Sequence, residues 1–313
     1  MAYSLKENLM KEDRLSGGHR MCAGCGSPIA VRTVLRALNP EDKAVVCSAT
    51  SCLEVSTFMY PYTAWKDSFI HNAFENAAAT ISGVETAYRA MKKRGKLDDT
   101  YKFIAFGGDG GTYDIGFQSL SGAMERGHDM VYVCYDNEAY MNTGIQKSSL
   151  TPFGAKTTTT PAGRNAHGCL TQKKNVFEIV AAHGIPYAAT ASVGYLPDFL
   201  RKLERARDIR GTRFIHVIAP CPTGWGCPEA DMVDVARDIV DCGLWYLVEY
   251  EGPQLSGVPG GQFKLSRNPR EFTSVEAYLR RQGRFRALTD DEIAQVEAGR
   301  DAKWEQIRRD WTA

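Results

Sequence analysis

The chain has 313 residues and a formal net charge of +1, with 43% hydrophobic and 24% charged residues. This balance is typical of a globular protein with a large core, and the near-neutral charge argues against a nucleic-acid partner. No apolar run reaches the roughly 18 residues of a membrane span, and the N-terminus lacks the apolar core of a signal peptide, so we expect a cytoplasmic protein without a membrane partner.

The first two of the nine cysteines, Cys22 and Cys25, form a CxxC pair before a predicted helix. We expect Ser27 as its N-cap, Pro28 as its first residue and its end near residues 39–40. A helix N-terminus favours thiolates, and a reducing compartment disfavours disulfides. A redox pair would normally follow a strand, and none is predicted here. Zinc and a [4Fe-4S] cluster each need two more thiolates, and the spacing does not separate them.

The next segment, residues 44–49, is predicted to be a strand. Cys47 lies in the middle of this strand, and we expect it to be a core residue. Cys52 follows the strand, and we expect it on a loop, where a thiol is available as a ligand. Residues 70–91 are predicted to form one helix, with small residues that allow close packing.

Two apolar runs, residues 103–107 and 131–135, each end in polar residues and glycines, as buried parallel strands do where they meet a ligand-binding loop. Asn137 follows Asp109 by 28 residues, close to the roughly 30 residues of a βαβ unit, so both side chains should lie at one rim of the sheet. Their oxygens suit Mg²⁺ holding a diphosphate, and glycines let backbone N–H groups approach phosphate oxygens. A helix over 111–127, with Ile115 facing inward, would point its N-terminus at that anion.

The remaining elements are predicted from apolar spacing. We expect helices at 175–183, 197–210, 229–241 and 290–309, and strands at 187–192, 214–219 and 245–250. Cys221 follows the strand at 214–219. The chain shows no internal repeat and no clear linker, so we assign one α/β domain, residues 1–250, and a C-terminal extension, residues 251–313. Trp304 and Trp311 suggest that the extension packs on the domain or on a partner subunit.

Two motifs carry a family resemblance. Gly108-Asp109-Gly110, with Asn137 at its spacing, resembles the thiamine-diphosphate (TPP) signature. Residues 136–146, DNEAYMNTGIQ, resemble the cofactor loop of the β subunit of 2-oxoacid:ferredoxin oxidoreductases. The resemblance implies a TPP-binding α/β fold, with a doubly wound, mostly parallel sheet flanked by helices. The cofactor-binding positions that it implies are Cys52, Gly108, Asp109, Gly110, Gly111, Asn137, Ala139 and Asn142.

The same resemblance implies roles for particular residues. Asp109, the Asn137 side chain and the Ala139 carbonyl would hold Mg²⁺, and Asn142 would face the reacting centre as a catalytic residue. The resemblance also implies that one [4Fe-4S] cluster is bound by Cys22, Cys25, Cys52 and Cys221. Cys227, six residues after Cys221, is the alternative fourth ligand.

The implied activity is oxidative decarboxylation of a short 2-oxo acid. Pyruvate is the first expectation, with oxalate or another 2-oxo acid open, and electrons would pass singly to ferredoxin while the acyl group usually passes to coenzyme A. No match to the family's catalytic Glu or to its CxxCxxCxxxCP motif occurs in this sequence, so alpha-, gamma- or delta-type subunits should supply both. The alternatives are a non-redox TPP lyase or transferase subunit with a structural zinc, and a non-catalytic subunit that retains the fold.

Overall fold

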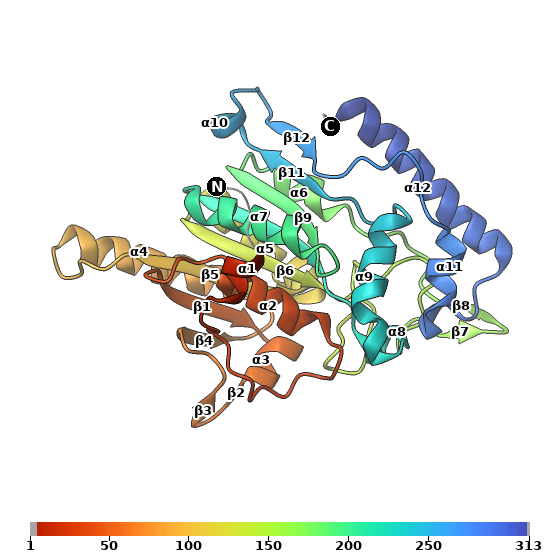
Figure 1. The fold of residues 1–313 in the computed structure, drawn as a ribbon, viewed down its shortest axis with the longest axis horizontal. Coiled ribbons are helices and arrows are strands. Elements are labelled where there is room, and N and C mark those ends of the chain that lie inside the picture. The colour runs from red at the N-terminus through yellow and green to blue at the C-terminus, as the bar shows by residue number, and fades with distance from the viewer. Residues whose placement is uncertain (1–4, 312–313) are drawn as a thin grey trace.

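Eight strands form one sheet with helices on both of its faces (Figure 1). The computed structural model describes residues 5–311. Six neighbouring strands run parallel and two antiparallel strands extend one edge, which confirms the predicted doubly wound, mostly parallel sheet. Their spatial order is β12 (Gln262–Leu265), β11 (Val248–Glu251), β9 (Tyr187–Ser192), β10 (Thr212–Ile218), β6 (Met130–Asp136), β5 (Tyr101–Gly108), β1 (Lys43–Ala49) and β4 (Ser68–Asn72).

The central strands β6 and β10 are buried along their whole length. The sequence of β6 is a nearly continuous apolar run, as expected for a parallel strand that helices cover on both faces, whereas β10 also buries Thr212, Arg213 and His216. Because β1, β5, β6 and β10 are parallel neighbours, their carboxyl ends open at the same edge of the sheet. Ligands bind at such an edge in open α/β sheets.

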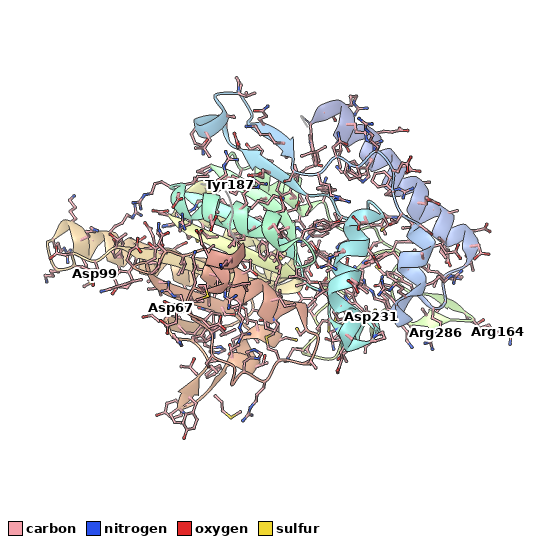
Figure 2. The ribbon with its side chains drawn as sticks, in the orientation of Figure 1. Asp67, Asp99, Arg164, Tyr187, Asp231 and Arg286 are labelled. Atoms are coloured by element: carbon pink, nitrogen blue, oxygen red, sulfur yellow. The ribbon has the colours of Figure 1, made fainter. Side chains whose placement is uncertain are left out.

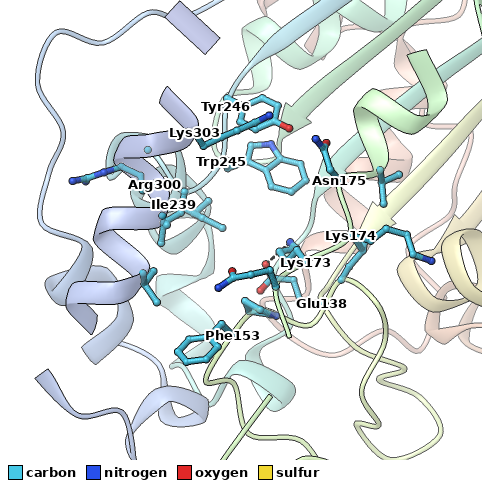
Figure 3. Close-up of a pocket in the computed structure, with 18 of the residues that line it drawn as sticks. Glu138, Phe153, Lys173, Lys174, Asn175, Ile239, Trp245, Tyr246, Arg300 and Lys303 are labelled. Atoms are coloured by element: carbon cyan, nitrogen blue, oxygen red, sulfur yellow. Dashed lines mark hydrogen bonds and ion pairs between the residues drawn. The ribbon is translucent and has the colours of Figure 1, made fainter. Parts of the chain in front are cut away.

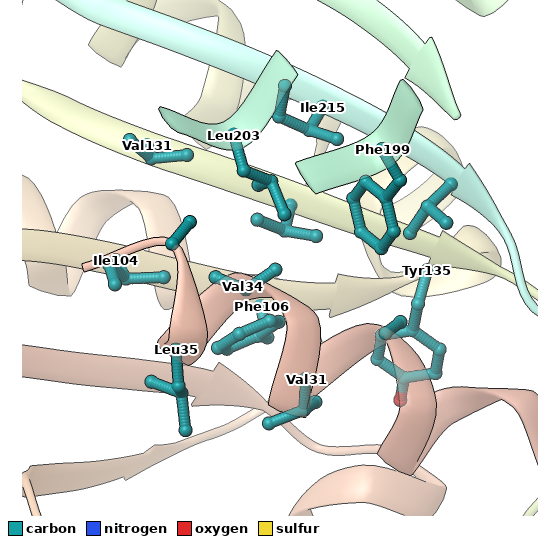
Figure 4. Close-up of a cluster of buried hydrophobic side chains, with 14 of the residues drawn as sticks. Val31, Val34, Leu35, Ile104, Phe106, Val131, Tyr135, Phe199, Leu203 and Ile215 are labelled. Carbon is teal, nitrogen blue, oxygen red and sulfur yellow. The ribbon is translucent and has the colours of Figure 1, made fainter. Parts of the chain in front are cut away.

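Helices divide the core into two layers, because alternate strand residues point to opposite faces. Figure 4 shows Val34 and Leu35 of one helix in the same cluster as Phe199 and Leu203 of another, with Val34 next to the sheet residue Phe106. None of the helices within residues 5–311 combines the length and the apolar character needed to cross a membrane. One face carries α2 (Gly26–Arg36) and α7 (Leu196–Asp208), and the other carries α4 (Ala77–Lys93), α5 (Phe117–Glu125) and α6 (Val176–Ala181).

The C-terminal third packs on the chain's own core. Trp304 is 2% exposed and donates from Nε1 to the Gly243 carbonyl at 2.8 Å, and Trp311 stacks on Phe263 with ring centroids 4.9 Å apart. A capping box formed by Thr289 and Glu292 starts the last helix, where an N-cap is expected. The domain boundary after residue 250 stays a prediction. The larger helices here are α9 (Met232–Asp241), α11 (Val275–Arg280) and α12 (Asp290–Asp310).

Four sequence predictions about where helices and strands begin are wrong. The segment 70–91 is not one helix, because its start belongs to the edge strand β4. The segment 111–127 opens with a π-helical turn that leaves Ile115 exposed. Helix α2 begins at Gly26, so Cys25 rather than Ser27 is its N-cap, and Cys52 opens a helix instead of lying on a loop.

The short elements are α1 (Leu5–Leu9), α3 (Cys52–Thr57), β2 (Phe58–Met59), β3 (Tyr62–Thr63), the π turn (Gly111–Ile115), β7 (Ala162–Gly163), β8 (Ala166–His167), α8 (Pro222–Trp225), the 3-10 turns Glu229–Asp231 and Gly283–Phe285, and α10 (Pro253–Ser256).

A buried carboxylate, Glu249 on β11, ties α7 to the edge of the parallel sheet. Tyr187, labelled beside α7 in Figure 2, donates to Glu249 Oε2 at 2.7 Å, and Arg201 and Arg205 donate to the same carboxylate at 2.7 and 3.0 Å. Burial alone would raise the pKa of Glu249, but the Tyr187 hydrogen bond and the Arg201 charge outweigh it, and the pKa is lowered. The ionised carboxylate therefore stabilises the fold.

We expect Glu249→Gln to lower the free energy of unfolding by about 2 kcal/mol at neutral pH, the scale of a hydrogen bond to a charged group. Because the folded pKa is depressed, this stabilisation is present above the unfolded-state value of about 4.3 and is lost as the pH falls through the folded value. Urea denaturation at a series of pH values measures both effects. The exposed Glu305→Gln is the control, and a pH-independent difference between wild type and Glu249→Gln would contradict the prediction.

Candidate functional site

Two strand ends bring the predicted oxygen ligands together. Asp109 follows β5 and Asn137 follows β6, and these strands are parallel neighbours in register Gly108↔Tyr135. The Asn137 amide satisfies its hydrogen bonds when its nitrogen faces Asp109 and Ala139. The nitrogen then donates to Asp109 Oδ1 at 3.0 Å and to the Ala139 carbonyl at 2.9 Å. The three groups therefore face one point at the rim of the sheet.

The carboxyl of Asp109 is in an environment that opposes its ionisation. It is 1% exposed, and burial, followed by the negative charge of Asp136, raises its pKa well above the ordinary value. The Ser148 hydroxyl donates to Asp109 Oδ2 and acts in the opposite direction. A cation beside this carboxyl would favour its ionised form.

The glycine loop after β5 is shaped by one aromatic ring. A Cβ at Gly110 would lie 2.3 Å from the Tyr140 ring, whose hydroxyl donates to the Gly110 carbonyl at 3.0 Å. Gly108 and Gly111 have more space, since their nearest contacts to a Cβ would be 3.6 Å from Tyr135 and 3.2 Å from Phe74. Only Gly110 of these three is therefore required by direct packing. At Gly108 and Gly111 the absence of a side chain lets backbone N–H groups approach a ligand.

Three of the four predicted cysteine ligands stand at the start of a helix. Cys25 is the N-cap of α2, Cys52 is the first residue of α3, and Cys221 is the N-cap of α8. Cys22 is exposed, three residues before Cys25. The Gly26 N–H donates to the Pro220 carbonyl at 2.9 Å, which joins the start of α2 to the segment that delivers Cys221.

The four thiols are close enough to affect one another electrostatically. Burial, and then the charges of Cys221, Cys25 and Cys22, raise the pKa of Cys52 to about 12. Burial also raises the pKa of Cys221 to about 11, although the Gly224 N–H donates to its sulfur at 3.3 Å. Within residues 5–311, no group of three or more His, Cys, Asp or Glu side chains lies at the spacing of a single bound metal ion. In a [4Fe-4S] cluster each thiolate binds a different iron, so the sulfurs lie farther apart than around one ion.

The other cysteines stand apart from this set. Cys47 is fully buried in β1, as predicted, and Cys242 is buried beside α9. Cys227 is buried as well, and its charged neighbours are Arg284, Arg281 and Asp231 rather than the other thiols. All nine cysteines are free.

Asn142 connects the cysteines to the oxygen ligands. It is exposed and lies beside Cys52, where its amide lowers the pKa of that thiol against the larger effect of burial. Asn142 and Cys52 line a small cavity of about 20 Å³ together with Asp109, Asn137 and Ala139. The structure therefore gathers all predicted oxygen ligands and one cysteine around a single crevice, with the other three cysteines beside it.

Comparison with known proteins shows which sequences this chain resembles. Residues 44–217 match the family model described as thiamine pyrophosphate enzyme, C-terminal TPP binding domain. The chain is 49% identical to pyruvate synthase subunit PorB of Methanocaldococcus jannaschii, over 94% of this chain and 96% of that protein. The chain belongs to the β-subunit family of the 2-oxoacid:ferredoxin oxidoreductases.

Other members of this β-subunit family match at similar extent. PorB of Thermotoga maritima is 48% identical over 95% of this chain and 92% of its own length. Ketoisovalerate oxidoreductase subunit VorB of Pyrococcus furiosus is 43% identical over 95% of this chain and 93% of its own. A solved 2-oxoglutarate:ferredoxin oxidoreductase from Magnetococcus marinus shares the fold, with a TM-score of 0.56 and 19% identity over 72% of this chain and 79% of that one. The predicted class, an oxidoreductase subunit, is confirmed.

Sequence patterns did not reveal a buried ionic network behind the oxygen ligands. Lys173 Nζ lies 3.1 Å from Asp136 Oδ2 and 2.7 Å from Glu138 Oε1, beside a cavity of about 610 Å³ (Figure 3). Burial would raise the pKa of Asp136, but the Lys173 charge and the hydrogen bond from His216 lower it. Burial lowers the pKa of His216, which keeps the imidazole neutral. No local motif marks Lys173 or Ser148 in the sequence, because each meets its partner only in the fold.

Proposed function

We propose that this chain binds Mg²⁺ and TPP at the crevice beside β5 and β6, and one [4Fe-4S] cluster at the neighbouring cysteines. With these groups it would carry out the oxidative decarboxylation of a short 2-oxo acid, pyruvate first, and pass single electrons toward ferredoxin. The observation that carries this proposal is the meeting of the two ligand sets through Asn142 and Cys52. The relatives are named pyruvate synthase and ketoisovalerate oxidoreductase subunits, which supports this substrate class.

The donor set fits Mg²⁺. Asp109 Oδ1 and the Ala139 carbonyl oxygen both lie within 3.0 Å of the Asn137 amide, which carries a third hard oxygen, and Mg²⁺ prefers a few protein oxygens completed by water and phosphate. Binding requires the Asn137 amide to turn its oxygen toward the ion, a rotation about one side-chain bond. The cavity of about 20 Å³ has room for an ion-sized group, and Gly108 and Gly111 would supply backbone N–H groups to a diphosphate.

The thiol set fits a [4Fe-4S] cluster. Cys22, Cys25, Cys52 and Cys221 affect one another electrostatically, whereas Cys227 lies among arginines, which supports Cys221 as the fourth ligand. The raised thiol pKa values describe the protein without iron, and a bound metal deprotonates its thiols outright. The non-redox lyase alternative is set aside by membership of an oxidoreductase family.

This chain's own residues would hold and orient the reactants. TPP, when bound, supplies the electron sink for decarboxylation. Asn142 is exposed and lies between the oxygen ligands and Cys52, so its amide is placed to hydrogen-bond a substrate oxygen. The Cys52 sulfur lies at the same crevice and offers a short path for electrons.

The rest of the machinery belongs to partners in this proposal. The relatives are named as subunits, and we propose that companion subunits supply the catalytic Glu and further clusters, with ferredoxin as electron acceptor and coenzyme A as acyl acceptor. Oxalate remains open as an alternative substrate. We also propose a cytoplasmic location, which nine free thiols support because reducing compartments keep thiols unpaired.

The first test is an anaerobic visible spectrum with iron and acid-labile sulfide analysis of the purified complex and of this chain. We expect a broad thiolate-to-iron band that dithionite bleaches, and about four irons in this chain, as one [4Fe-4S] cluster requires. A colourless chain that holds about one zinc would overturn the electron-transfer role.

A further inference from the structure

The backbone of Glu138 is strained. Its φ is 67°, in the left-handed region that residues other than glycine rarely adopt. Glu138 stands between Asn137, whose amide nitrogen donates to Asp109 Oδ1, and Ala139, whose carbonyl accepts from the same nitrogen. The unusual turn at Glu138 therefore sets how the groups on either side of it are presented.

Every polar group of Glu138 is held by a partner. Its N–H donates to Asp136 Oδ1 at 2.9 Å, and its carbonyl accepts from the Thr151 hydroxyl at 2.7 Å. Lys173 holds carboxylate oxygen Oε1, and Arg284 donates to oxygen Oε2. Glu138 is 2% exposed, so these contacts replace all of its hydration.

Arg284 also packs on Trp225, which hydrogen-bonds Asn137, the residue before Glu138. Its guanidinium carbon lies 3.9 Å from the centroid of the Trp225 ring, and the Trp225 indole N–H donates to the Asn137 carbonyl at 2.8 Å. Gln282 fixes the guanidinium from the other side by accepting from its Nε at 2.9 Å. The contacts form a closed ring through Glu138, Arg284, Trp225 and Asn137.

Packing alone does not support this turn. Glu138 and Lys173 line the cavity of about 610 Å³, so one side of the loop faces open space instead of a packed core (Figure 3). The four buried or half-buried charges of Asp136, Lys173, Glu138 and Arg284 balance to zero. The network therefore provides a fixed geometry at a place where apolar contacts are missing.

We propose that Arg284, with Trp225, is a positioning residue that clamps the Glu138 turn and so presents the Asn137 and Ala139 oxygens to Mg²⁺ and TPP. This inference rests on the proposed function. It gives the C-terminal segment a part in cofactor binding, through the 3-10 turn Gly283–Phe285, 146 residues from Glu138 in the sequence.

The test compares single and double variants in the complex reconstituted with its partner subunits. Arg284→Met leaves Glu138 short of a partner, so we expect a lower Tm and weaker binding of TPP at saturating Mg²⁺. The double variant Glu138→Gln/Arg284→Met restores the charge balance, so we expect its Tm to recover while its Kd for TPP stays at least about 10-fold above wild type. A tenfold change in Kd corresponds to about 1.4 kcal/mol.

Trp225→Phe and Arg281→Met complete the design. Trp225→Phe keeps an aromatic ring beneath Arg284 and removes the N–H donor to Asn137, so we expect a Kd for TPP raised about 2–10-fold, the scale of one hydrogen bond. The cluster spectrum should be unchanged, and the Tm should fall because Trp225 is fully buried. Arg281, a neighbour whose ion pairs are with Asp231 and Asp238, is the matched control, and Arg281→Met should bind TPP like wild type.

Two results would be decisive against different claims. A double variant that recovers both Tm and TPP affinity would show that the network only stabilises the fold, and this would overturn the positioning role. A wild-type complex that fails to bind TPP with Mg²⁺ would overturn the proposed function itself. Isothermal titration with TPP and thermal unfolding of the same samples separate the two.

Discussion

Asp109→Asn is expected to reduce the affinity for TPP at saturating Mg²⁺ by at least about 100-fold, because changes in residues that merely support a metal ligand already cost 10–100-fold. The amide keeps the size of the side chain and its contact with Ser148. It removes the negative charge that a cation needs. Titration of the reconstituted complex with TPP measures the loss.

The same substitution should not destabilise the cofactor-free chain. Burial and the charge of Asp136 raise the pKa of Asp109, so the folded state opposes its ionised form, and a neutral side chain removes that penalty. The [4Fe-4S] spectrum should also be unchanged. Asp114→Asn, one helical turn away and with its carboxylate on the Ser149 N–H, is the control and should bind TPP within about twofold of wild type. Wild-type affinity in Asp109→Asn would remove Asp109 from the metal site.

Cys221→Ser is expected to abolish the cluster and turnover with it, whereas Cys227→Ser should keep both. Cys221 lies at the N-terminus of α8, and its sulfur accepts the Gly224 N–H, an arrangement that stabilises a thiolate ligand. Cys227 is buried, and its sulfur contacts the Arg281 carbonyl at 3.5 Å.

Iron and sulfide content, with the electron paramagnetic resonance spectrum of the dithionite-reduced protein, measures the outcome. Cys227→Ser is the matched control, since it changes a cysteine only six residues away. The opposite pattern, with the cluster lost from Cys227→Ser and kept in Cys221→Ser, would reassign the fourth ligand.

The sequence was most informative where a buried strand ends in a ligand loop. β5 and β6 were predictable because their apolar runs stop at glycines, carboxylates and amides, and this pattern also gave the meeting of Asp109 and Asn137. β4 was missed because a short apolar run at the start of a helical pattern does not distinguish a strand from a helix. Ser27 was an incorrect cap because the helix starts one residue after Cys25, where the chain is tied to Pro220.

Lys173 and Arg284, which hold the Glu138 turn, could not be predicted from the sequence for a different reason. Both residues contact Glu138. Lys173 lies 35 residues from Glu138 in the sequence, and Arg284 lies 146 residues from it. Neither position has a local pattern that separates it from an ordinary surface cation. Contacts of this kind depend on the completed tertiary structure, so only coordinates reveal them.

The separation of the cysteines in the sequence has a consequence for how the protein is made. Cys22 precedes Cys221 by 199 residues, which a ribosome adding roughly 5–20 residues per second takes about 10–40 s to synthesise. During that time the first pair of thiols has left the ribosome while the last ligand does not yet exist. Completion of the proposed cluster therefore has to wait until β10 has joined the sheet. A complete cluster would then form only in a chain whose central strands have folded.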